Sequence, residues 1–83
     1  MKEVTIYESS QCPYCRKAKA LLDKKGIKYN TIRTEFGTPE IQALMDRTKM
    51  RTVPQIFIGD TLIGGFDDLK ALSDNGKLDD MLK

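Results

Sequence analysis

Residues 4–15 carry the sequence VTIYESSQCPYC, and this stretch decides the fold. Its first four residues are rich in β-branched and aromatic side chains and predict a strand. Cys12 and Cys15 follow after a polar loop, and Pro13 between them suits the first position of a helix. That spacing on one helical turn brings the two Cα atoms to about 5 Å, which disulfide geometry accepts. A bridge that closes so short a loop restrains little of the unfolded chain, so the pair indicates a reversible redox couple.

Length and composition predict a single small domain over residues 1–83, since 40% of the residues are hydrophobic, enough for one modest core. The first residues lack the apolar run of a signal peptide, and no stretch approaches the length of a membrane span. Two cysteines so close together do not form the framework of a secreted disulfide scaffold. We therefore expect a cytoplasmic monomer that does not associate with membranes.

The net charge of +2 is too small to indicate a nucleic-acid-binding protein, yet the charges are unevenly placed. Residues 13–28 carry six cations and one carboxylate, whereas residues 60–80 carry six carboxylates and two lysines. Solvated helix faces explain both segments. The cationic segment also lies beside the cysteines, where it would favour a thiolate and attract anionic thiols.

The residues after the first cysteine predict a helix and then a second strand. Cys12 is the expected N-cap, and the apolar positions of the next dozen residues repeat at helical spacing until Gly26, a natural C-cap. The segment 27–33 then alternates as a strand would. Together with residues 4–7, these segments make a βαβ unit, whose crossover is right-handed by strong precedent.

The second half of the chain predicts a helix, a hairpin and another helix. Residues 38–40 place a cap, a proline and an acid in order, which starts a helix. Two β-rich segments then flank a Gly-Asp pair, as in a hairpin, and two glycines and two aspartates open the next helix. The last apolar residues suggest one more short turn or helix. The predicted order is β-α-β-α-β-β-α, with hairpin segments at 53–58 and 61–63.

A thiol–disulfide exchanger needs one thiol that is ionised at neutral pH and a second that resolves the mixed disulfide. Cys12 suits the first role because the N–H groups and dipole of a helix N-terminus stabilise its thiolate, with Arg16 and Lys17 one turn on. Cys15, on the apolar face, would keep a higher pKa and attack Cys12 only after a mixed disulfide has formed. We predict Cys12 as the exposed nucleophile and Cys15 as the shielded resolving thiol; the alternative is two buried cysteines that are adjacent by chance.

Two further segments admit both a structural and a functional interpretation. Pro54 is either an edge-strand or turn proline, or a cis proline that presents the Val53 backbone to a peptide-like substrate beside Cys12. The run 64–68, GGFDD, is either a turn with a capped helix or a place where backbone approaches closely and carboxylates hold an ammonium group. The residues by themselves leave both choices open.

The three motifs CPYC at 12–15, TVP at 52–54 and GGFDD at 64–68 together resemble the small bacterial dithiol glutaredoxins, over essentially the whole chain. The resemblance implies an α/β thioredoxin fold, with a four-stranded mixed sheet of order 2-1-3-4 flanked by helices. It implies glutathione-dependent reduction of protein disulfides and glutathione mixed disulfides. It also implies glutathione as a co-substrate, with no bound cofactor or metal.

The resemblance assigns glutathione contacts residue by residue. Tyr14 resembles the aromatic that borders the glutathione cysteinyl group, and Val53 would pair its backbone with that group. Asp67 and Asp68 match the positions that hold the γ-glutamyl end, and Gln42 resembles a residue that reaches the glycyl carboxylate. The predicted glutathione site comprises Tyr14, Gln42, Arg51, Thr52, Val53, Pro54, Gly65, Phe66, Asp67 and Asp68.

The chain departs from the family at one position, and other functions compete. Many members carry a lysine three residues before the first cysteine, where this chain has Ser9, which bears on the Cys12 pKa and on glutathione binding.

The competing binding function is a carrier that holds an iron–sulfur cluster through Cys12 and glutathione, although such relatives typically have glycine and serine in place of Pro13 and Cys15. A zinc site would lack histidine and be half-ligated by two thiolates. A thioredoxin proper is disfavoured by the absence of tryptophan and by the run 64–68.

Overall fold

The computed structural model describes residues 2–10 and 12–82. Gln11, which the sequence places in the loop before Cys12, lies outside the described residues. The strands are β1 (Val4–Glu8), β2 (Asn30–Arg33), β3 (Gln55–Ile58) and β4 (Thr61–Gly64), and the helices are α1 (Pro13–Lys24), α2 (Pro39–Thr48), α3 (Phe66–Asp74) and α4 (Lys77–Leu82).

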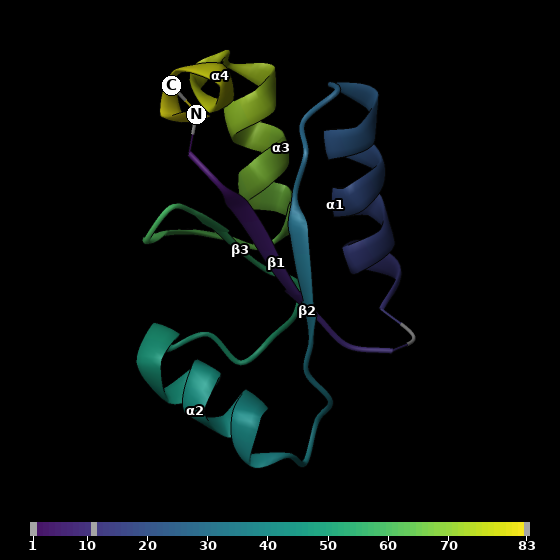
Figure 1. Ribbon diagram of the computed structural model, residues 1–83, viewed down its shortest axis with the longest axis vertical. Helices are drawn as coiled ribbons and strands as arrows, with labels where there is room; N and C mark the ends of the chain where they lie inside the picture. The colour runs from purple at the N-terminus through teal and green to yellow at the C-terminus, as the bar shows by residue number, and fades with distance from the viewer. Residues whose placement is uncertain (1, 11, 83) are drawn as a thin grey trace.

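The strands form one mixed sheet in the order β2-β1-β3-β4, which confirms the predicted order (Figure 1). β1 is parallel to β2 and antiparallel to β3, and β3 pairs antiparallel with β4. Because α1 connects the parallel pair, the chain begins with the expected βαβ unit. Figure 1 also shows α2 apart from the other helices, at the far end of the molecule from α4.

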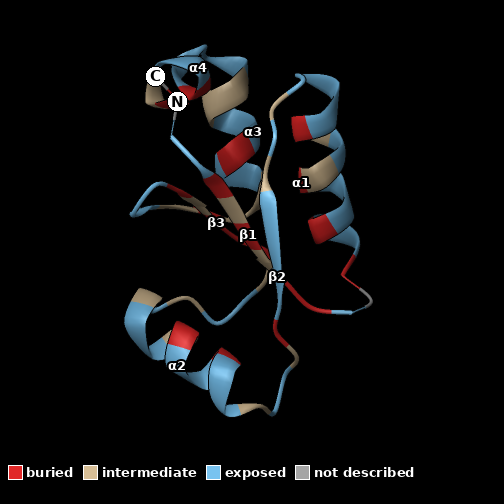
Figure 2. Ribbon diagram, in the orientation of Figure 1, coloured by how far each residue is buried: buried red, intermediate tan, exposed pale blue. Residues whose placement is uncertain are grey.

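The hydrophobic core lies on the face of the sheet that α1, α3 and α4 cover (Figure 2). Burial alternates along β1, where Val4 and Ile6 are buried and Thr5 and Tyr7 are half-buried, as the two faces of a pleated strand require. On the opposite face, the Arg47 guanidinium of α2 lies 5.7 Å from the ring centroid of Phe57. The buried core comprises Val4, Ile6, Ala18, Leu22, Ile56, Ile58, Leu69, Leu78 and Leu82.

The helix starts confirm the predicted caps. The Cys12 side chain accepts a hydrogen bond from the first turn of α1, and the Thr38 hydroxyl accepts one from the Ile41 N–H at 3.4 Å. Both caps precede a proline at the first helical position, where the missing N–H costs nothing. The last apolar segment forms a helix, α4, and not merely a turn.

The expected start of the second strand is wrong by three residues. The ladder with β1 begins at Asn30, which pairs with Thr5, and not at Ile27. The Ile27 N–H instead donates to the Leu22 carbonyl at 2.9 Å, which ties the residue to the end of α1. The α1 C-cap is likewise Lys25, one residue before Gly26, whose φ of 72° reverses the chain.

None of the described helices is long and apolar enough to cross a membrane.

Candidate active site

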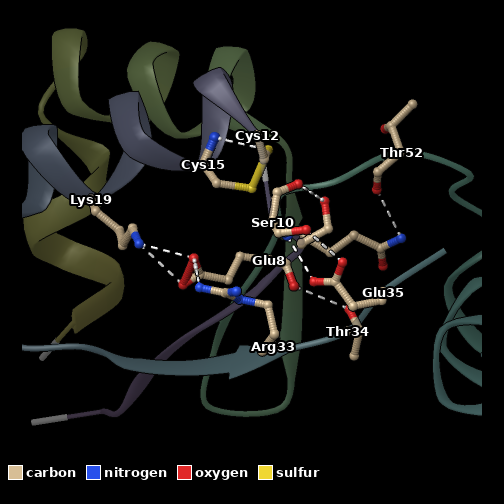
Figure 3. Close-up of a disulfide and its surroundings, with 11 residues drawn as sticks. Glu8, Ser10, Cys12, Cys15, Lys19, Arg33, Thr34, Glu35 and Thr52 are labelled. Atoms are coloured by element: carbon tan, nitrogen blue, oxygen red, sulfur yellow. Dashed lines mark hydrogen bonds and ion pairs between the residues drawn. A yellow bond between two sulfur atoms is a disulfide. The ribbon is translucent and has the colours of Figure 1, made fainter.

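Cys12 and Cys15 form a disulfide at the N-terminus of α1 (Figure 3). Their Cα atoms are 5.2 Å apart, as the one-turn spacing predicts. β1 ends at Glu8 and leads into the loop before the disulfide. Pro13, which lies between the two cysteines in the sequence, is the first residue of α1. The disulfide therefore lies at one end of the sheet, where β1 leads into α1.

The helix N-terminus gives the Cys12 sulfur a backbone donor. The Cys15 N–H donates to Cys12 Sγ at 3.1 Å, and the Arg16 N–H donates to the Cys12 carbonyl at 3.2 Å. When the bridge is reduced, the same N–H and the positive end of the helix dipole are placed to stabilise a Cys12 thiolate.

The expectation that Cys12 is exposed is wrong for the oxidised form. Cys12 is 9% exposed and Cys15 only 1%. The Cys12 sulfur is bonded to the Cys15 sulfur and accepts a hydrogen bond from the Cys15 N–H, so it lies over the first turn of α1. Cys12 is nevertheless the more accessible of the two.

The cations near the dithiol lie on the solvent side of α1. Arg16 and Lys17 are exposed, and the Lys17 Nζ lies 4.9 Å from the centroid of the Tyr14 ring. Ser9, at the position where many family members have lysine, is 7% exposed, and its hydroxyl donates to the Ser10 carbonyl at 3.4 Å. Position 9 therefore contributes no charge here, and its side chain lies in a buried place.

Tyr14, which lies between Cys12 and Cys15 in the sequence, lines a groove of about 330 Å³. All but two of the residues predicted to bind glutathione line this groove. The peptide bond between Val53 and Pro54 is cis, as one of the two interpretations of Pro54 expects, and Pro54 directly precedes β3. The only lining residue that was not predicted is Met50. The groove is lined by Tyr14, Met50, Thr52, Val53, Pro54, Gly65, Phe66, Asp67 and Asp68.

Aromatic rings and a helix start form the walls of this groove. The Tyr14 ring is 53% exposed, with its centroid 6.2 Å from that of Phe66. Asp68 Oδ2 accepts a hydrogen bond from the Gly65 N–H at 3.1 Å, so this carboxylate caps α3. Gly64 has a φ of 122°, and a Cβ there would run into the Asp68 carboxylate. The run 64–68 therefore caps a helix and lines the groove at once.

Gln42 and Arg51 are the two predicted residues that lie outside the groove. They line a separate hollow of about 210 Å³, together with Met45, Asp46 and Lys49. The Gln42 amide donates to Asp46 Oδ1 at 2.9 Å, one turn further along α2. Arg51 lies between Met50 and Thr52, which line the groove, so this hollow adjoins the same loop.

Gln55 is a residue of the site that sequence reasoning missed. It follows the cis proline, is fully buried, and donates from Nε2 to the Met50 carbonyl at 3.2 Å and the Thr52 carbonyl at 3.1 Å. These bonds hold the loop that forms one side of the groove. The only signal in the sequence is a polar residue at a position that the hairpin pattern expects to be buried.

Another hollow, of about 660 Å³, lies between the start of β1 and the end of α1, and it contains none of the predicted residues. Size therefore does not single out the groove; its position beside the disulfide does.

Comparison with known proteins decides the family. Residues 4–63 match the glutaredoxin family model. The chain belongs to the glutaredoxin family. It is 48% identical to a glutaredoxin of Pseudomonas aeruginosa, covering 99% of this chain and 98% of the relative, and 43% identical to glutaredoxin 3 of Escherichia coli K12 over the whole of both chains. The solved buckwheat glutaredoxin–glutathione complex superposes with a TM-score of 0.86 at 38% identity, covering 98% of this chain and 76% of that one.

Family and geometry together establish the activity of this glutaredoxin. It has the thioredoxin-like α/β fold of the family, and its two cysteines form the Cys-x-x-Cys disulfide. The protein is therefore a glutathione-dependent thiol–disulfide oxidoreductase with a Cys12–Cys15 dithiol centre.

Proposed function

We propose that Cys12 is the attacking thiol, that Cys15 is the resolving thiol, and that glutathione binds in the groove beside them. The observation that carries the proposal is the disulfide at the α1 N-terminus, next to a groove lined by Val53, cis Pro54 and Asp67. We further propose that the protein acts in the cytoplasm as a monomer, on disulfide-containing and glutathionylated proteins, without binding nucleic acid or membranes.

The reduction of a protein disulfide then takes two exchanges. The Cys12 thiolate attacks one substrate sulfur, the substrate S–S bond breaks, and the released substrate thiolate takes up a proton. The Cys15 thiol loses its proton and attacks Cys12 Sγ, which forms the Cys12–Cys15 bond and releases the second substrate thiol. Two glutathione molecules return the dithiol and leave as glutathione disulfide, so two electrons and two protons balance.

The groove suits the parts of glutathione in order. The cysteinyl group would lie between Tyr14 and the backbone of Val53, where a strand-like pairing leaves its sulfur facing Cys12. The γ-glutamyl ammonium would meet the carboxylates of Asp67 and Asp68.

The glycyl carboxylate would extend toward the hollow of about 210 Å³. Gln42 and Arg51 lie there with Lys49, so this end supplies cations and an amide donor. The relative from buckwheat was solved as a complex with glutathione, which supports a site of this kind in the family.

A trapping experiment with single-cysteine variants tests the assignment of the two cysteines. Cys15→Ser incubated with glutathione disulfide should gain the mass of one glutathione at Cys12 and should still reduce glutathione mixed disulfides, which needs one thiol. Cys12→Ser should lose both properties. Equal loss in the two variants would overturn the assignment while leaving the family intact.

The iron–sulfur carrier remains the alternative prediction, and it uses the same sulfur. A Cys12 thiolate that ligates a cluster cannot form the bridge with Cys15. Absorbance of the freshly purified protein at about 400 to 450 nm would favour the carrier. An oxidoreductase without a cluster should not absorb in that range.

A further inference from the structure

Glu8 places a carboxylate inside the protein next to the redox centre. Side chains alternate along β1, so Glu8 shares the helix-covered face with Val4 and Ile6. The residue is only 6% exposed. A carboxylate in such a place is costly unless cations pair with it, so its partners matter.

Two cations from neighbouring elements meet this carboxylate. The Lys19 Nζ of α1 lies 2.9 Å from Glu8 Oε1 and 3.1 Å from Oε2. The Arg33 Nη2 lies 3.8 Å from Oε1, because the parallel register of β1 and β2 places Arg33 opposite Glu8. The cluster therefore joins the ends of β1 and β2 to the middle of α1.

The cluster lies beneath the turn that carries the disulfide. Lys19 follows Cys15 by four residues, so the two side chains share one face of α1. Figure 3 shows Lys19 reaching from α1 to the Glu8 carboxylate below Cys12 and Cys15. Cys15 itself is 1% exposed, so it is shielded from bulk solvent on this face of the helix.

We propose that Glu8, Lys19 and Arg33 are positioning residues that set the balance between dithiol and disulfide. Nothing in the catalytic assignment uses them. Only the reduced centre carries thiolate charge, so a nearby cation stabilises the dithiol form and a nearby carboxylate disfavours it. Glu8 offsets the charge that Lys19 would otherwise present to the reduced centre. The inference rests on the proposed roles of Cys12 and Cys15 only in placing the thiolate of the reduced centre on Cys12.

Other charged groups near the centre face different atoms. The Glu35 carboxylate accepts hydrogen bonds from the Ser10 N–H and hydroxyl, both at 2.7 Å, on the loop before the disulfide. Arg16 and Lys17 lie on the exposed side of α1. Among the described residues, Glu8, Lys19 and Arg33 are thus the charged groups that meet beneath the disulfide.

The test is the equilibrium of charge-neutralised variants with a glutathione redox buffer. The ratio of dithiol to disulfide is read after acid quenching by thiol alkylation and mass spectrometry. Glu8→Gln should raise this ratio about threefold to tenfold, and Lys19→Met should lower it by a similar factor. Arg33→Met, which alters an exposed side chain at a longer distance, should lower it by less. The double variant of Glu8→Gln with Lys19→Met should return close to the wild type.

The matched control is another lysine–carboxylate pair of the same chain. Lys70 Nζ lies 2.8 Å from Asp74 Oδ2 at the exposed end of α3, so Asp74→Asn should leave the ratio unchanged. A titration of the lone Cys15 thiol, by absorbance at about 240 nm in a Cys12→Ser background, should show a lower pKa in Glu8→Gln and a higher pKa in Lys19→Met. If Glu8, Lys19 and Arg33 had a purely structural role, their substitution would lower the melting temperature, but the ratio would not depend on the sign of the charge that is removed.

For Glu8→Gln and Lys19→Met, ratios that stay within about twofold of the wild type, or that move in the same direction, would overturn the inference. If these two variants fail to fold, Arg33→Met decides the test because its side chain is exposed: a ratio equal to or above that of the wild type would then overturn the inference. The failure of the proposed function looks different: the wild type itself would not equilibrate with glutathione. The ratio of dithiol to disulfide is then measured for the same variants in a dithiothreitol redox buffer. The inference requires the variants to rank in the same order there.

Discussion

Asp68 Oδ2 accepts a hydrogen bond from the backbone N–H of Gly65 at 3.1 Å, and the same carboxylate lines the groove beside the disulfide. Asp67, the preceding residue, lines the groove too, and no hydrogen bond joins its side chain to the helix start among the described residues. Asp68 therefore both caps the helix and lines the groove, whereas Asp67 only lines the groove.

We expect Asp67→Ala and Asp68→Ala each to weaken the use of glutathione several-fold, because each removes an anion that would meet the γ-glutamyl ammonium. Only Asp68→Ala should lower the melting temperature, by several degrees, since loss of a cap costs about 1 kcal/mol. Glutathione kinetics and melting curves on both variants check this. A loss of stability in Asp68→Ala with unchanged kinetics in both variants would mean that the glutathione site lies elsewhere.

Gln55→Leu should destabilise the protein by about 1–3 kcal/mol, because the carbonyls of Met50 and Thr52 then lose a buried donor. The loop that these carbonyls belong to forms one side of the groove, so the KM for glutathione should also rise. Urea unfolding and steady-state kinetics measure the two effects. Wild-type stability in the variant would show that the loop is held by other contacts.

Glu35 should make stability depend on acid pH. Hydrogen bonds from the Ser10 hydroxyl and N–H lower the pKa of Glu35 below its ordinary value of 4.5. A depressed folded-state pKa means that the stabilisation is present above the ordinary value and is lost as pH falls through the lowered one. The melting temperatures of the wild type and Glu35→Gln should therefore differ above about pH 5 and converge below pH 4.5. A difference that is constant with pH would contradict this.

Ser9→Lys tests the one departure from the family pattern. An ammonium group near the α1 N-terminus should lower the Cys12 pKa and tighten glutathione binding. Ser9 is only 7% exposed, so the longer side chain has to move outward, and we expect some loss of stability. Thiolate absorbance against pH is the measurement. An unchanged titration would show that the helix N-terminus and the neighbouring cations already set the Cys12 pKa.

Local chemistry explains which parts of the fold could be predicted from the sequence. Cys12 and Thr38 are caps that act within one turn and precede a proline, so their roles follow from neighbouring residues. The start of β2 was misplaced because Ile27 alternates like a strand residue while its N–H bonds to the end of α1. Periodicity reports which way side chains point, but not which backbone groups are paired.

The unpredicted parts of the site depend on contacts between distant segments. The Glu8 cluster needs the register that sets Arg33 opposite Glu8 and the packing of α1 over β1, and neither is visible in a local pattern. Gln42 lines a hollow of its own with Arg51 because α2 carries it, and the place of α2 relative to the hairpin depends on contacts that no local pattern shows. Eight of the ten residues that the resemblance assigns to glutathione line one groove, because most of them come from three short motifs.

A coupled assay with glutathione, glutathione reductase and a glutathione mixed disulfide tests the central claim most directly. The protein should speed NADPH oxidation in proportion to its concentration, and this should require glutathione and vanish in Cys12→Ser. Thioredoxin reductase in place of glutathione and its reductase should support no turnover. Turnover with thioredoxin reductase, or none with glutathione, would contradict the account that Cys12 and Cys15 form a dithiol reduced by glutathione.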